Sequence, residues 1–86
     1  MRRLIVTPAF DRDWKHCTSD VKEKVLPHLL SLREVRLPSR EQDIRKLSGI
    51  TPPAFRLRVG DYRVIFTIDA TTITLLSIGH RKDIYR

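Results

Sequence analysis

The 86-residue sequence has one cysteine, three glycines and no long apolar run. A single cysteine, Cys17, excludes an internal disulfide bond and a multi-cysteine metal site, and it is typical of a reducing compartment such as the cytoplasm. The apolar run at residues 4–6 is too short for the core of a signal peptide or for a membrane span. We therefore predict a soluble, cytoplasmic protein without membrane association, metal or other cofactor.

Acidic residues are also scarce. The chain has 17 Lys and Arg against 10 Asp and Glu, a formal net charge of +7. Residues 45–86 hold eight Lys or Arg against three Asp, whereas residues 1–44 hold nine against seven acids. This excess predicts a polyanionic partner, either nucleic acid or an acidic protein. The alternative is a merely solvated surface, but the preference for arginine, whose planar fork suits phosphate, favours a ligand.

Arginines alternate with apolar residues over residues 54–66. This period of two predicts two strands joined at Gly60 and Asp61, because glycine at the first loop position supplies the positive φ that a two-residue turn requires. The facing pairs are then Val59 with Tyr62, Arg58 with Arg63, Leu57 with Val64 and Phe55 with Phe66. Like charges directly opposite each other destabilise a sheet, so the two facing arginines indicate an anionic ligand.

Two more strands and a first helix are expected from local signals. Residues 3–6 form a short first strand. A helix follows with Thr7 as its N-cap and Pro8 at its first position. Residues 73–79 are rich in β-branched and apolar residues on both faces, which is typical of an interior strand.

A second helix is expected after the cap candidates Ser19 and Asp20, running to about Arg36. Apolar residues recur along it at helical spacing. Pro27 lacks an amide hydrogen, so it either kinks this helix or breaks it into two pieces.

These elements predict an α+β fold in one domain spanning residues 1–86. Residues 37–53 are irregular, with one turn at most around residues 44–47. The order β-α-α-β-β-β gives a mostly antiparallel four-stranded sheet with two helices packed on one face. The apolar side chains of the hairpin face the helices. The opposite, open face carries Arg56, Arg58, Arg63 and Ile65.

Three segments resemble the RelE/ParE superfamily of bacterial toxins, most closely the RelE branch. The segments are residues 46–49, the hairpin at residues 55–66, and Ile78-Gly79-His80-Arg81 followed by Ile84-Tyr85. The resemblance implies a RelE-like fold and the toxin of a type II toxin-antitoxin system. The implied activity is a ribosome-dependent, metal-independent endoribonuclease (mRNA interferase) that cleaves messenger RNA in the ribosomal A site.

The resemblance also implies a chemistry and its residues. The RNA 2′-hydroxyl attacks the adjacent phosphate and leaves a 2′,3′-cyclic phosphate. Arg63 matches a family arginine that steadies the phosphorane, and Arg81 one near the leaving oxygen. Tyr85 matches a C-terminal tyrosine that stacks on a base or assists proton transfer. The other expected RNA contacts are Arg45, Lys46, Lys82 and Arg86.

Two positions depart from the family. Arg56 and Arg58 stand where the best-known members carry lysines, and a guanidinium keeps its proton at physiological pH, so neither can be the general base. His80, Tyr85 and Glu41 are the alternatives for that role.

Two other functions stay open from the residues. One is a ParE-like inhibitor of DNA gyrase, and the other is a non-catalytic or attenuated RNA-binding homologue. The resemblance implies a small, acidic, RelB-like antitoxin in a toxin-antitoxin hetero-oligomer, besides the ribosome and its message. Ile65, Leu76 and Ile78 are the candidate apolar contacts for that antitoxin.

Overall fold

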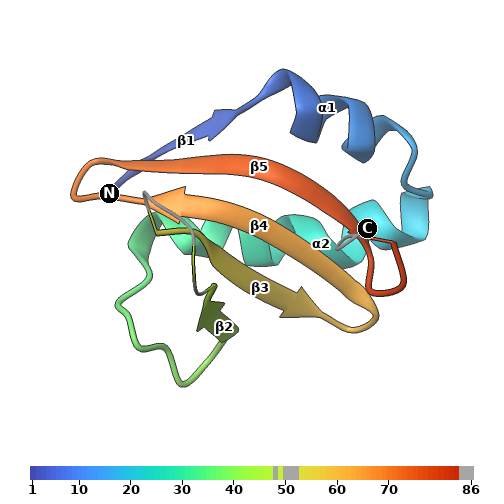
Figure 1. Ribbon diagram of the computed structural model, residues 1–86. Coiled ribbons are helices and arrows are strands. Elements are labelled where there is room, and N and C mark those ends of the chain that lie inside the picture. Colours follow the sequence, from blue (N-terminus) through green and yellow to red (C-terminus); the bar gives the residue numbers. More distant parts are fainter. Residues whose placement is uncertain (48, 50–52, 84–86) are drawn as a thin grey trace.

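The computed structural model describes residues 1–47, 49 and 53–83, which form one sheet with helices on one face (Figure 1). The sheet has five strands in the order β1-β5-β4-β3-β2. β1 is parallel to β5, and every other neighbouring pair is antiparallel, as predicted for the sheet as a whole. The strands are β1 (Arg3–Val6), β2 (Asp43–Lys46), β3 (Phe55–Val59), β4 (Tyr62–Ile68) and β5 (Thr72–His80).

The fifth strand, β2, corrects the expectation of a four-stranded sheet and of an irregular stretch at these residues. β2 pairs with β3, where Ile44 lies opposite Leu57. Ile44 is the one apolar residue of this four-residue edge strand and packs against the core. A single apolar residue gives no readable alternation, so only pairing with β3 reveals the strand.

The first helix, α1 (Pro8–Lys15), begins as predicted. The Thr7 hydroxyl accepts a hydrogen bond from the Phe10 amide at 3.2 Å, which satisfies one of the free amides of the first turn. The second helix, α2 (Ser19–Ser31), is capped by Thr18 rather than by Ser19 or Asp20. Both helices are therefore capped by a threonine whose own backbone is extended.

The second helix is shorter than its apolar periodicity suggests. The α-helix ends at Ser31, and a separate 3₁₀ helix follows at Leu32–Glu34. The expected extension of the α-helix to about Arg36 is therefore wrong. Pro27 lies inside α2 without ending it, which excludes a break into two pieces. Neither helix in the described part of the chain has the length and apolar character needed to cross a membrane.

One buried cluster joins the helices to the sheet. α1 contributes Phe10 and α2 contributes Val25 and Leu29. From the sheet come Leu57, Val59, Val64, Phe66, Ile73, Leu75 and Ile78. Full burial of such a side chain contributes about 1.5–3 kcal/mol, so this cluster keeps the sheet against the helices.

The hairpin of β3 and β4 has the predicted register. Arg58 lies opposite Arg63, and Leu57 lies opposite Val64. Gly60 has a φ of +60°, and no residue other than glycine has a positive φ in the described chain. Glycine at this loop position therefore permits the tight turn that sets the register.

The turn between β4 and β5 depends on Asp69. Its Oδ1 accepts hydrogen bonds from the amides of Thr71 and Thr72, both at 2.8 Å. The hydrogen bond from the Thr71 amide is the main cause that lowers the pKa of Asp69 below its ordinary 3.8. The ionised carboxylate thus stabilises the turn.

This pKa shift predicts how stability depends on pH. Because the folded pKa is lowered, the contribution of Asp69 is present above pH 3.8 and is lost as the pH falls through the folded pKa. Urea unfolding of the wild type and of Asp69→Asn should show a clear difference in stability at about pH 6 and a smaller one at about pH 2. A difference that stays constant over this range would contradict the assignment.

Candidate nucleic-acid interface

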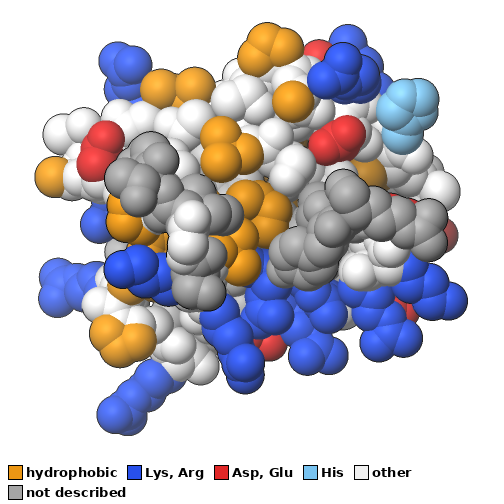
Figure 2. All heavy atoms as spheres, viewed as in Figure 1, with side chains coloured by type: hydrophobic (Ala, Val, Ile, Leu, Met, Phe, Trp, Pro, Cys, Tyr) orange, Lys and Arg blue, Asp and Glu red, His pale blue; other side chains and the backbone are white. Residues whose placement is uncertain are grey.

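Four arginines from three strands lie on the open face of the sheet. Strand alternation and register place them there: Arg45 of β2, Arg56 and Arg58 of β3, and Arg63 of β4. Arg45 lies directly opposite Arg56, and Arg58 lies directly opposite Arg63. Figure 2 views this face, and its basic side chains gather over the region of β3 and β4.

Two facing arginine pairs make this face electrostatically costly. Like charges directly opposite each other on a sheet repel, and hydrophobic packing lies on the other side. Three local arrangements reduce the repulsion: an ion pair, hydrogen bonds to backbone carbonyls, and exposure to solvent.

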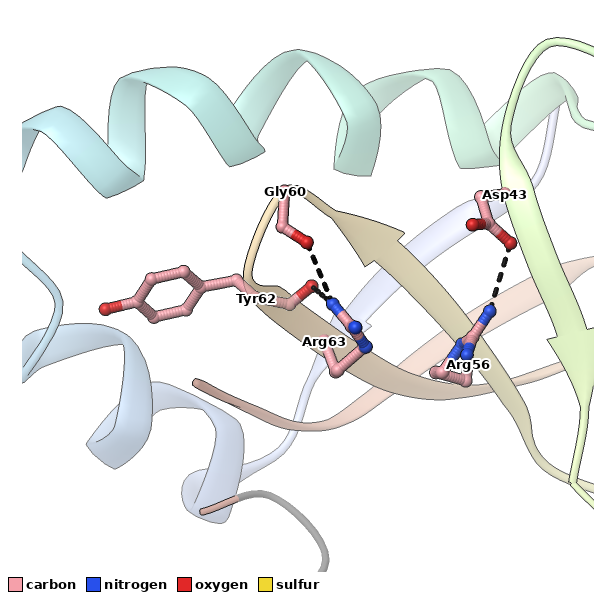
Figure 3. A network of polar contacts seen from close by, with 5 residues as sticks. All are labelled: Asp43, Arg56, Gly60, Tyr62 and Arg63. Atoms are coloured by element: carbon pink, nitrogen blue, oxygen red, sulfur yellow. Dashed lines mark hydrogen bonds and ion pairs between the residues drawn. The ribbon is translucent and has the colours of Figure 1, made fainter. Parts of the chain in front are cut away.

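Arg56 is neutralised within the fold. Its Nη2 donates to Oδ1 of Asp43 at 3.0 Å, an ion pair that joins β3 to β2 (Figure 3). The Arg56 side chain is only 16% exposed, and its Nε is buried without a hydrogen-bond partner. This pairing makes Arg56 a brace between two strands and leaves little of its charge for a ligand.

Arg63 is buried by a different arrangement. It is 7% exposed, and its Nη1 donates to the carbonyl oxygens of Gly60 at 2.9 Å and Tyr62 at 3.1 Å (Figure 3). Among the described residues no carboxylate pairs with it. A buried guanidinium held only by carbonyls keeps its full charge in a medium of low dielectric, where an incoming anion is attracted strongly.

The other basic residues of the face are open to solvent. Arg45 and Arg58 are exposed, and so is Lys46, which lies opposite Phe55 on the other face of β2. Within the described ranges none of them forms an ion pair. These side chains can therefore meet an anion without first losing a protein partner.

Arg81 lies beside the hairpin turn. Its amide donates to the Asp61 carbonyl at 2.7 Å, and its Nε lies 3.8 Å from Asp61 Oδ1, with the Arg81 side chain 55% exposed. Arg63 lies opposite Gly79, two residues before Arg81. The two arginines thus come to the same end of the sheet from distant parts of the sequence.

The structure does not bring His80 to the arginines. His80 lies opposite Tyr62, and the two rings form an edge contact at 5.7 Å. Tyr62 packs against the core, so this pair belongs to the helix side of the sheet. The His80 Nδ1 also accepts the Lys82 amide at 3.2 Å, which occupies the nitrogen that would take a proton.

Glu41 is likewise apart from the arginines. It lines a pocket with Pro27, His28 and Ser31 of α2, beside Gln42. Lys82 is exposed after β5. The predicted site residues Tyr85 and Arg86 lie outside the described residues.

The family follows from comparison of the whole chain. A family model described as the ParE toxin of type II toxin-antitoxin systems, parDE, matches residues 4–85. The chain belongs to this toxin family. The predicted membership in the RelE/ParE superfamily is confirmed.

Individual relatives agree with this assignment. Toxin RelE3 from Methanocaldococcus jannaschii is 27% identical over 89 residues, which cover 96% of this toxin and 94% of the relative. A chain in the RelB-RelE antitoxin-toxin complex from Methanococcus jannaschii has a TM-score of 0.74 at 27% identity and 94% coverage of both chains. A chain of the E. coli DinJ-YafQ complex has a TM-score of 0.82 at 15% identity, covering 99% of the toxin and 98% of that chain, and shows the fold alone.

Sequence reasoning missed the two acids that hold arginines in the toxin. Asp43 had no readable signal, because its strand was not recognised. Asp61 was noticed only as a turn residue, and its contact with Arg81 depends on the β4–β5 pairing.

One of the expected apolar contacts for the antitoxin is corrected. Ile78 is 3% exposed and belongs to the core, whereas Ile65 and Leu76 are half-buried.

The contrast between two facing arginines gives a stability prediction. Arg63→Ala should lower the free energy of unfolding by about 2 kcal/mol, because two hydrogen bonds from a charged donor are lost from a buried position. Arg58→Ala should change it by less than about 0.5 kcal/mol, because that side chain is exposed and its removal relieves repulsion. Urea unfolding measures both. Equal effects of the two substitutions would contradict the different environments of these arginines.

Proposed function

We propose that the toxin is a ribosome-dependent endoribonuclease that cleaves messenger RNA in the ribosomal A site. The observation that carries this proposal is the open sheet face, which holds four arginines from three strands. Among the described residues of these strands, Asp43 is the one acid that forms an ion pair with them. Such a face suits a phosphate backbone better than a neutral ligand. The alternating register keeps it rigid, which favours catalysis over loose binding.

The arginines would act on the charge of the transition state. Attack of the RNA 2′-hydroxyl on the adjacent phosphorus forms a phosphorane and then releases the 5′-oxygen of the next nucleotide, leaving a 2′,3′-cyclic phosphate. The phosphorane carries more negative charge than the ground-state diester. Preset guanidinium groups therefore stabilise it more than the substrate, which is the requirement for acceleration.

The roles differ among the basic residues. Arg63 and Arg81 face the reacting phosphate, and Arg58 adds charge from the neighbouring strand. Arg56 supports the face through Asp43. The flanking phosphates are contacted by the exposed residues Arg45, Lys46 and Lys82. Arg86 is proposed for the same role on the basis of its position in the sequence.

Proton transfer needs a different kind of residue. Guanidinium groups stay protonated, so the arginines stabilise charge and do not accept the 2′-hydroxyl proton. The placements of His80 and Glu41 argue against both as the base. Tyr85 is proposed from its sequence position to stack on a base and assist proton transfer.

We also propose an acidic, RelB-like antitoxin as partner, in a toxin-antitoxin hetero-oligomer. The relative from Methanococcus jannaschii crystallised as a RelB-RelE complex. The net charge of +7 and the half-buried apolar residues Ile65 and Leu76 on the open face suit an acidic segment with apolar side chains.

A second candidate function is inhibition of DNA gyrase. The family model that matches this chain carries the ParE name, which favours it. The clustered arginines favour the nuclease, because inhibition by binding alone would not require charge preset for a phosphorane.

The nuclease proposal predicts the effect of Arg81→Ala. This substitution should lower cleavage of ribosome-bound message about 100-fold, because it removes one preset donor to the transition state. Cleavage is measured in a cell-free translation reaction by primer extension, which reports new 5′-hydroxyl ends. Lys15→Ala on α1 removes the same charge from a helix and should cleave at the wild-type rate.

The same reactions separate the alternatives. Unimpaired translation at micromolar wild-type protein, together with inhibition in a DNA supercoiling assay, would replace the nuclease by the gyrase inhibitor. Salt-sensitive RNA binding without any product would indicate a non-catalytic homologue.

The antitoxin proposal predicts a local effect on binding. The product of a short acidic reading frame next to the toxin gene should co-purify with the toxin. Leu76→Asp should weaken that association at least about tenfold in a titration, because it places a like charge and a polar group at an apolar contact. Leu26→Asp on α2 is the matched control on the other side of the sheet. Equal losses for both variants would contradict an open-face contact.

A further inference from the structure

Three consecutive carbonyl groups of the β3–β4 turn hold arginines. The carbonyls of Gly60 and Tyr62 accept hydrogen bonds from Arg63 Nη1, at 2.9 and 3.1 Å (Figure 3). The carbonyl between them, that of Asp61, accepts the amide of Arg81 at 2.7 Å. One short turn thus contacts two arginines that are 18 positions apart in the sequence.

From these contacts we infer that this turn presets the two arginines for phosphate, and that Asp61 is the positioning residue of Arg81. The inference rests on the proposed nuclease function and deepens it. It assigns a role to a carboxylate that touches neither substrate nor reacting atoms. Asp61 acts through the guanidinium of Arg81.

The turn contacts only part of each guanidinium. Arg63 uses Nη1 for both carbonyls, and its Nε and Nη2 make no hydrogen bond within the described residues. These two nitrogens form one edge, which can donate two parallel hydrogen bonds to phosphate oxygens. The contact with the turn therefore fixes Arg63 and leaves a bidentate edge for the ligand.

The turn contacts the guanidinium of Arg81 at Nε, whereas it contacts that of Arg63 at Nη1. The Asp61 carboxylate lies 3.8 Å from Nε, so it faces the stem side of the guanidinium. The two terminal nitrogens form the end of the planar group that lies farthest from the stem, and their outward N–H bonds form the second possible bidentate edge. Arg63 and Arg81 can thus approach one phosphate with different edges.

The need for orientation is greater at Arg81 than at Arg63. The Arg81 side chain is 55% exposed, whereas Arg63 is buried at 7% exposure. An exposed arginine loses rotamer entropy when it is ordered. A carboxylate beside it in the free protein reduces the entropy left to lose in the transition state.

Gly60 makes this arrangement possible. Its φ of +60° turns the chain so that successive carbonyls are available to the arginines. A Cβ at this position would also lie 2.7 Å from the Nζ of Lys24, which packs over the turn. Glycine therefore leaves room for Lys24 beside the turn, whose carbonyls accept hydrogen bonds from Arg63 and from the Arg81 amide.

Asp61→Asn tests the inference, because it keeps the backbone carbonyl and removes only the charge. Cleavage of ribosome-bound message should slow about tenfold at saturating toxin, while the toxin concentration for half-maximal cleavage stays unchanged. Asp61→Glu should restore most of the rate. Glu23→Gln on α2 is the matched control, since it removes the same charge from an exposed helical position.

A second readout does not depend on activity. The Nε–H resonance of Arg81, assigned by its loss in Arg81→Lys, should shift and narrow toward that of a free arginine in Asp61→Asn. It should keep its position in Glu23→Gln. The thermal unfolding temperatures of the wild type, Asp61→Asn, Asp61→Glu and Glu23→Gln should agree within about 2 °C, which separates positioning from stability.

The outcomes are distinct. A wild-type cleavage rate in Asp61→Asn, or an Arg81 resonance indifferent to that substitution, would overturn the inference. If the wild-type toxin does not cleave message at all, the proposed function fails, and the Arg81 resonance alone then decides whether Asp61 positions Arg81.

Discussion

The two-residue turn at Gly60 and Asp61 controls the register of β3 against β4, and the rest of the toxin depends on that register. A slip by one residue would exchange the faces of the whole strand. Leu57 would then point to solvent, and Arg58 would enter the core. Because both faces are strongly specialised, the register is held by apolar packing on one side and by the tight glycine turn at its end.

The same register concentrates positive charge, and the fold manages that charge in three ways. Asp43 neutralises Arg56, backbone carbonyls hold Arg63, and solvent screens Arg58. None of the three removes the net charge of the face. The remaining field is available to an anion such as phosphate, while the facing arginines still repel one another across the sheet.

Likeness of fold does not by itself identify a functional site. A chain of the E. coli DinJ-YafQ complex has nearly the same fold at 15% identity, a level at which side-chain roles do not transfer. The function of this toxin must therefore be argued from its own residues. Here the argument rests on guanidinium groups, since the histidine and the glutamate suggested by sequence lie elsewhere in the structure.

Local sequence signals determined the hairpin, its facing residues, the start of α1 and the open arginine face, because each depends on neighbours a few residues apart. Pairing between distant segments decided the rest. Only β2 lying beside β3 shows that Arg56 is neutralised by Asp43, and only β5 lying beside β4 places His80 on the helix side and Arg81 at the turn. These contacts join residues 13 to 20 positions apart, and no local periodicity encodes which strands become neighbours.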